Sequence, residues 1–107
     1  MAIRAVRGTV VDLTDTPIPG VPVQCALNVP TAYTSTVAVI PTPIAQVTDS
    51  SGIYYLSLYA QADLTPSGTE YVLTIGNEVH TMVVPSTAYN GSRPTYFDAV
   101  LDGLITS

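Results

Sequence analysis

The sequence has one cysteine, one histidine, no lysine and no tryptophan. A single cysteine excludes an internal disulfide bond and any zinc site built from several thiolates. Three arginines stand against eight carboxylates, so the formal net charge is -5. Because proteins that bind nucleic acid or anionic membranes present basic surfaces, we expect neither kind of partner.

Long apolar runs are absent as well. No stretch reaches the ~20 consecutive apolar residues that a membrane-spanning helix needs. The first residues, MAIRAVRG, also lack the apolar segment of a secretory signal. The expectation is a protein that is made in the cytoplasm and not secreted.

The composition nevertheless favours a folded chain. Hydrophobic residues make up 47% of the 107 residues and charged residues only 10%, which excludes a disordered protein. The length predicts a single domain over residues 1–107. Within it we expect a core region at 3–85, a loop at 30–43, and a C-terminal strand and tail at 86–107.

Alternation of apolar and polar residues indicates strands, and no segment shows a convincing helical period. Turns rich in Gly, Pro, Asp and Asn separate the runs. The expected strands cover residues 3–13, 21–29, 37–40, 44–48, 53–59, 69–75, 79–84 and 96–101. Seven or eight short antiparallel strands at this spacing predict an all-β, Ig-like β-sandwich.

The alternation also predicts which side chains are buried. Segment 21–29 has apolar residues at every second position, so its odd positions should face the core. Tyr54 and Tyr55 are adjacent and must point to opposite faces; we expect Tyr54 inside and Tyr55 outside. The expected core comprises Val21, Val23, Cys25, Leu27, Leu56, Leu58, Leu73 and Ile75.

Reactive residue types do not form a recognisable site. His80 lies within an expected strand, and no Ser-His-Asp or Cys-His spacing accompanies it. Cys25 is on the apolar register and should be an inert, buried thiol. We therefore predict no catalytic, cofactor-binding or metal-binding residues, and a protein that is not an enzyme.

The aspartates fit turns better than metal sites. Asp12, Asp15 and Asp49 flank turns without the spacing of a calcium loop, so we expect them to cap those turns. Asp98 and Asp102 are four residues apart, which in the expected strand separates them by about 13 Å. Such an arrangement does not support a pair of catalytic carboxylates.

Tyrosine accounts for seven of the eight aromatic residues. Its rigid ring and polar tip suit exposed contact surfaces. The candidate interface residues are Tyr33, Tyr55, Tyr89 and Tyr96.

Three linked motifs carry a resemblance to a known family. They are a G-x-V-x-D strand end, a P-I-x-G-V-x-V turn and strand, and a T-D-x-x-G-x-Y-x-L turn and strand. Their residues are Gly8, Val10 and Asp12; Pro17, Ile18, Gly20, Val21 and Val23; and Thr48, Asp49, Gly52, Tyr54 and Leu56. Over about residues 3–85 the chain resembles the carboxypeptidase regulatory-like, or transthyretin-like, β-sandwich family, which implies the fold but no activity.

A second resemblance is narrower. The polar loop at 30–43, residues 62–76 (ADLTPSGTEYVLTIG) and residues 83–87 (VVPST) are similar to modules in structural proteins of tailed bacteriophages, especially minor tail and tail-fibre proteins. That resemblance implies a virion protein made in the host cytoplasm. Whether it belongs to the capsid or the tail stays open.

The function that follows is binding without turnover. The resemblance implies a virion structural protein that decorates or reinforces the capsid or tail, with other virion proteins as partners. Low charge and many neutral surface atoms predict a homo-oligomer or a lattice-bound state, with segments 30–43 and 86–107 reaching neighbouring chains. The alternative is a soluble adhesion or carbohydrate-binding module, in which tyrosines on the loops stack on sugars.

Overall fold

The computed structural model describes residues 3–29, 31–34, 36–40 and 42–106. Met1, Ala2, Pro30, Ser35, Pro41 and Ser107 lie outside this description; Pro30, Ser35 and Pro41 belong to the predicted 30–43 loop. The described elements are β1 (Ile3–Thr9), β2 (Pro22–Leu27), β3 (Ala32–Tyr33), β4 (Ala38–Val39), β5 (Ile44–Val47), β6 (Ile53–Tyr59), the 3-10 helix η1 (Gln61–Asp63), β7 (Tyr71–Ile75), β8 (Glu78–Met82) and β9 (Phe97–Asp98). The all-β prediction is confirmed.

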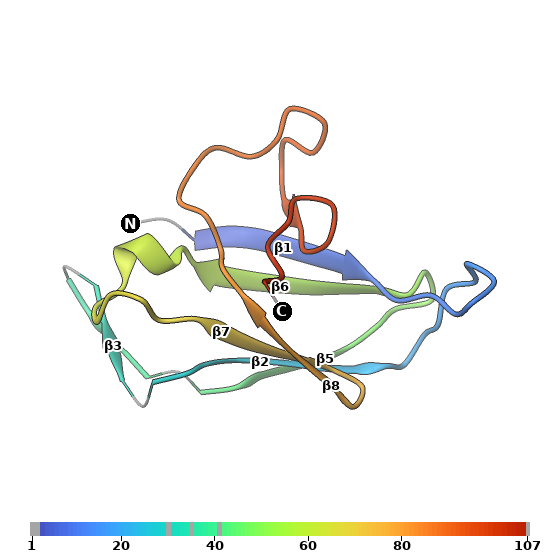
Figure 1. The fold of residues 1–107 in the computed structure, drawn as a ribbon, viewed down its shortest axis with the longest axis horizontal. Coiled ribbons are helices and arrows are strands. Elements are labelled where there is room, and N and C mark those ends of the chain that lie inside the picture. The colour runs from blue at the N-terminus through green and yellow to red at the C-terminus, as the bar shows by residue number, and fades with distance from the viewer. Residues whose placement is uncertain (1–2, 30, 35, 41, 107) are drawn as a thin grey trace.

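Two sheets form the layers of a sandwich (Figure 1). One sheet has the order β6-β1-β9 and the other β5-β2-β7-β8, while β3 and β4 form a small hairpin at one end of the molecule. The β7–β8 hairpin turns at Gly76, whose φ of 60° lies in the left-handed region that glycine adopts readily. No helix among the described residues is long and apolar enough to cross a membrane.

One strand pairing differs from the antiparallel expectation. β9 runs parallel to β1, with Val6 opposite Phe97 and Arg7 opposite Asp98. The chain leaves β8, crosses from one layer to the other, and reaches the free side of β1 in the same direction as that strand. This long connection permits the parallel geometry that a short hairpin turn does not allow.

The core between the sheets contains most of the predicted residues. Val23, Cys25, Leu56, Leu58 and Leu73 are buried. Leu27 and Ile75 are partly buried against the same cluster, whereas Val21 is only half-buried and lies outside it. Tyr54 is buried and Tyr55 is exposed, so the assignment of these neighbours to opposite faces is confirmed.

Two expected strands are too long. The run at 3–13 ends at Thr9, because the Asp12 carboxylate accepts hydrogen bonds from the backbone N–H groups of Thr14 and Thr16 and closes a loop. The run at 96–101 is reduced to β9. The Asp98 carboxylate accepts hydrogen bonds from the N–H groups of Val100 and Leu101, which bends the chain out of an extended conformation.

The C-terminal segment is also richer in core residues than expected. Phe97, Ala99 and Leu104 are buried in the main cluster. Leu104 and Thr106 are additionally hydrogen-bonded to the edge of β8, through Val83 N–H to Leu104 O at 3.0 Å and Thr106 N–H to Thr81 O at 2.8 Å. The expectation that segment 86–107 is a free arm with few core residues is therefore wrong for residues 97–106.

Candidate interaction surface

The four candidate tyrosines occupy three different environments. Tyr33, on β3, is 52% exposed and lies at the hairpin end of the molecule. Tyr55 is 41% exposed on the outer face of β6, and Tyr96 is half-buried just before β9. Tyr89 packs against its own domain, so the structure brings together only Tyr55 and Tyr96.

Tyr55 and Tyr96 meet around a cation. The Arg7 guanidinium carbon lies 5.1 Å from the centre of the Tyr55 ring and 4.3 Å from that of Tyr96. Arg7 is opposite Tyr55 in the β1–β6 register, so the sheet itself places the pair. The Tyr55 hydroxyl donates a 3.0 Å hydrogen bond to the Asp49 carboxylate, which raises the pKa of the tyrosine. This cluster is a rigid patch of aromatic and planar cationic surface on the outer face of the three-stranded sheet.

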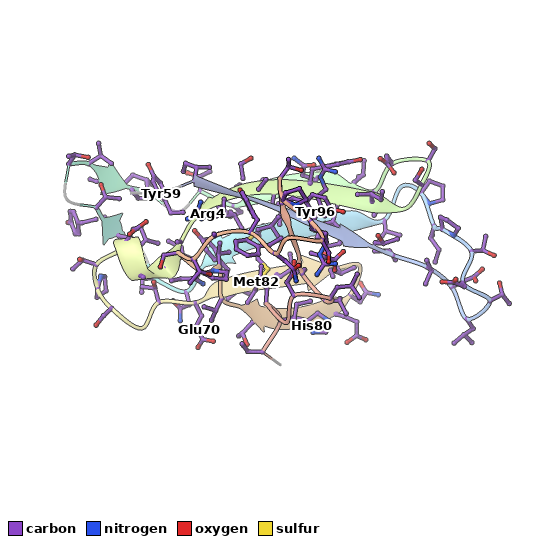
Figure 2. All side chains as sticks on the ribbon, turned by 90° about the horizontal axis from the view of Figure 1, so that it is seen from above. Arg4, Tyr59, Glu70, His80, Met82 and Tyr96 are labelled. Atoms are coloured by element: carbon purple, nitrogen blue, oxygen red, sulfur yellow. The ribbon has the colours of Figure 1, made fainter. Side chains whose placement is uncertain are left out.

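Tyr89 serves the fold. Its hydroxyl accepts a 3.0 Å hydrogen bond from the backbone N–H of Ala5, and its ring centre lies 4.8 Å from that of Phe97. The Arg4 guanidinium carbon stands 5.5 Å from the ring centre and its Nη2 donates to the carbonyl of Ser86. Tyr89 therefore holds the 86–96 connection against β1. Arg4, the β1 residue beside the Tyr89 ring, is labelled in Figure 2.

The described surface carries many large apolar side chains. None of them belongs to the Tyr55–Arg7–Tyr96 cluster except Tyr55, and they are distributed over both sheets and several loops. They are Ile3, Val11, Leu13, Tyr33, Val37, Ile40, Val47, Tyr55, Val79, Val83, Val100 and Leu101. Since a chain with so few charges cannot cover these groups with charged side chains, its surface favours neutral contacts with other proteins.

One side of the sandwich also has open strand edges. β6 pairs with β1 alone and β5 pairs with β2 alone, so among the described residues no strand covers the outer edge of either. On the opposite side, β9 covers β1 at Val6 and Arg7, and residues 104–106 cover part of β8. Figure 2, a view from above, shows the green ribbon of β6 along one long side of the sandwich and His80 of β8 toward the opposite side.

A cavity lies between the two open edges. Its volume is about 180 Å³, and its walls come from β2, β5, β6 and β7 together with residues around β4. The lining includes Leu27, Ile40, Ile44 and Tyr59, and no charged side chain contributes to it. Such a hollow fits an apolar side chain or a small apolar molecule.

Cys25 is one of the residues that line this cavity. Cys25 is buried, and burial raises the pKa of its thiol to about 12, which suppresses the reactive thiolate. Among the described residues no group of three or more His, Cys, Asp or Glu side chains is arranged to hold a metal ion. His80 lies in β8, as an ordinary strand residue would.

Two of the three turn aspartates cap their turns as expected. Asp12 Oδ1 accepts from the N–H groups of Thr14 and Thr16, and Asp49 Oδ1 accepts from those of Ser51 and Ile53. The Thr14 hydroxyl also donates to Asp12 Oδ1 at 2.7 Å and is the main cause of the lowered pKa of Asp12, while the backbone hydrogen bond from Ile53 is the main cause of the lowered pKa of Asp49. Asp15 instead occupies the left-handed region, with φ of 64°.

The 13 Å separation expected for Asp98 and Asp102 is wrong. The chain turns between them, so that the Asp98 N–H donates to Asp102 Oδ2 at 2.7 Å. Asp102 forms an ion pair with Arg93 and accepts a hydrogen bond from Arg93 Nε at 3.1 Å. The Arg93 hydrogen bond lowers the pKa of Asp102 to about 2. This ion pair holds the turn before the C-terminal segment and leaves no free carboxylate pair.

The Arg7 stack was not predicted from the sequence, and although the lack of lysine predicts unprotected sheet edges, it does not identify the strands that form them. Arg7 alternates onto the same face as Ala5 and Thr9, which does mark it as an outward residue. Its aromatic neighbours come from segments far along the chain, and nothing in the sequence shows which strands become edges. Comparison with protein-family models and with curated proteins finds no match to this sequence.

Proposed function

We propose that the protein is a non-enzymatic structural component of a tailed-bacteriophage particle, a β-sandwich that decorates or reinforces the capsid or tail through protein–protein contacts. The observation that supports this most is the exposure of large apolar side chains in a chain with only 10% charged residues. These exposed side chains are available for apolar contacts with other proteins. The similarity of residues 62–76 and 83–87 to modules of phage tail proteins is the reason for proposing a phage particle as the assembly.

The mechanism is contact formation. Exposed aromatic residues contribute most of the affinity in protein interfaces, and Tyr33 is the most exposed of the four candidate tyrosines. Its backbone is held by two 2.8 Å hydrogen bonds with Thr65, so the ring projects from a fixed position. A pre-positioned anchor loses little conformational entropy on docking.

The test is to purify particles on a density gradient and to quantify the protein in them by mass spectrometry. A structural component sediments with particles at a fixed number of copies. Tyr33→Ala should lower incorporation several-fold and leave the melting temperature unchanged, because the ring is mostly exposed. Tyr89→Ala is unsuitable as a second variant, since the Tyr89 hydroxyl and ring hold β1 and Phe97.

A carbohydrate-binding module is the alternative. The exposed Tyr55 ring beside Arg7 is the observation that favours it, because aromatic faces also bind sugars. A protein that is found free of particles and is retained on a glycan column would support this alternative and overturn the structural proposal.

A further inference from the structure

The outer edge of β6 has free backbone groups at its centre. Each residue of an antiparallel strand directs its N–H and its C=O to the same side, and the next residue directs both groups to the other side. Gly52 O accepts from Val10 N, whereas Ile53 O accepts from Asp49 N and Tyr59 O accepts from the Tyr71 hydroxyl. The odd-numbered residues of β6 therefore point away from β1, and Tyr55 and Ser57 present their N–H and C=O groups at an edge that no described strand covers.

The side chains beside this edge are uncharged. β6 carries Ile53, Tyr55, Ser57 and Tyr59 on its outer face, and the neighbouring free edge of β5, Ile44–Val47, has no ionisable residue. Lysine and other charges are the usual protection of exposed strand edges, and both edges lack them. The nearest carboxylate, Asp49, is hydrogen-bonded to Tyr55 at one end of the strand.

We infer that the partner of this edge is a second copy of the same chain, which pairs β6 with β6 in antiparallel orientation about a two-fold axis at Ser57. An isologous interface brings identical residues together, so it requires a patch that does not repel itself. In a chain of net charge -5 the neutral β5 and β6 edges meet that requirement. A partner that binds this acidic chain through opposite charge would carry basic side chains. Strands β5 and β6 contain no carboxylate with which those side chains could pair.

The register supports the same axis. With Ser57 opposite its own copy, Tyr55 of each chain lies opposite Tyr59 of the other. Directly opposed residues in such a pair have Cβ atoms about 5 Å apart, so both tyrosine pairs come into contact on the outer face. Tyr55 already points outward and is 41% exposed. The result is a continuous sheet with the order β9-β1-β6-β6-β1-β9 across two molecules.

This pairing deepens the proposed structural function, and its biological use rests on that function, but the pairing itself is measured on the isolated protein. Sedimentation velocity over increasing concentration should show the mass rising from 11.2 kDa toward that of a dimer. Amide hydrogen exchange at Tyr55 and Ser57 should slow as the dimer forms. A protein that stays monomeric at millimolar concentration overturns the inference.

Charge variants at the axis identify the edge. Ser57 is exposed, so Ser57→Lys should preserve the melting temperature and weaken dimerisation at least tenfold, because two ammonium groups meet at the axis. Val79→Lys, at an exposed strand position on β8, is the matched control and should dimerise normally. Mixing Ser57→Lys with Ser57→Glu should restore association as a heterodimer.

The other outcomes separate this inference from the proposed function. If Ser57→Lys dimerises normally while Val47→Lys does not, the pairing belongs to β5 and the β6 register is wrong. If the wild-type protein is monomeric and still sediments with particles, the edge inference fails and the structural function stands. If it dimerises through β6 and is never found in particles, the inference stands and the function fails.

Discussion

Gln61 is a polar side chain that the fold buries, at 8% exposure, at the first residue of η1. Its Nε2 donates to Met82 O at 2.8 Å and its Oε1 accepts from Val84 N at 2.5 Å. The side chain thus takes the place of a strand at the point where β8 ends. Without it, the buried N–H of Val84, which lies beyond the end of β8, would lose this partner.

Replacing Gln61 by leucine keeps the volume and removes both hydrogen bonds. We expect Gln61→Leu to lower the free energy of unfolding by about 2 kcal/mol or more, since each unsatisfied buried polar group costs about 1 to 3 kcal/mol. Urea denaturation measures the change. Gln24→Leu, an exposed position on β2, is the control and should change stability by less than about 0.5 kcal/mol. Equal effects of the two substitutions would contradict the role given to Gln61.

The C-terminal segment 97–106 acts as an element although it contains only a two-residue strand. β9 extends the β1 sheet, Ala99 N–H donates to Arg7 O at 2.8 Å, and Leu104 enters the core. The segment therefore connects both layers. The sequence predicted a strand at 96–101 followed by a tail, and it did not show that Leu104 is buried, because burial of an irregular segment leaves no periodic signal.

Leu104→Ala tests this connection. Leu104 is 2% exposed, and buried Leu→Ala substitutions cost about 2 to 5 kcal/mol. The melting temperature should fall clearly, as should that of a chain lacking residues 103–107. Leu101→Ala is the matched control, because Leu101 is 72% exposed three residues earlier and should be nearly neutral. A stable Leu104→Ala variant would return the segment to the status of a loose tail.

Strands with strict alternation were predictable from the sequence, and short or irregular ones were not. The segment around Val23 and Cys25 shows its inner face at every second residue, and turn residues such as Gly76 mark where hairpins begin. β9 is two residues long and runs parallel to its partner, a pairing that depends on the path of the preceding connection. Pairing partners and edges are properties of tertiary structure, so the open side of the sandwich could not be inferred from local pattern.

At the scale of the whole molecule, three carboxyl groups make the free energy of unfolding depend on pH in the acidic range. Asp12, Asp49 and Asp102 all have folded-state pKa values below the ordinary 3.8, and that of Asp102 is about 2. The cause for Asp102 is first its hydrogen bond with Arg93, and for the other two it is hydrogen bonding within their turns. A lowered folded pKa means that the unfolded chain takes up protons first as the pH falls.

The stabilisation from these groups is therefore complete above about pH 5 and is lost as the pH falls through about 2. Thermal melts across this range should show a falling melting temperature for the wild-type protein. Asp102→Asn should be less stable at pH 7 and should lose less on acidification. Parallel curves for the two proteins would show that the Arg93–Asp102 pair does not contribute.

The candidate surface was predicted only in part. Tyr33 and Tyr55 are exposed, as a contact role requires, while the bulk of Tyr89 and its hydroxyl are used by the fold. Within a strand, side chains alternate between the two faces, so the position of a tyrosine shows whether it points outward. Tyr89 lies in a long connection without such alternation, so its direction could not be predicted. The same limit applies to Tyr96, whose neighbour Arg7 is on the first strand of the chain.

The position of β1 in the middle of its sheet has a consequence for how the chain folds. Both of its partners, β6 and β9, follow it at large separations in sequence, whereas β7 and β8 join through a tight turn. Because distant segments pay more loop-closure entropy before they pair, the β7–β8 hairpin can form first and the β1 sheet later. Until β1 arrives, β6 has two open edges rather than one. The interval before β1 docks is thus the period in which this chain is most exposed to aggregation, and its length is set by topology more than by final stability.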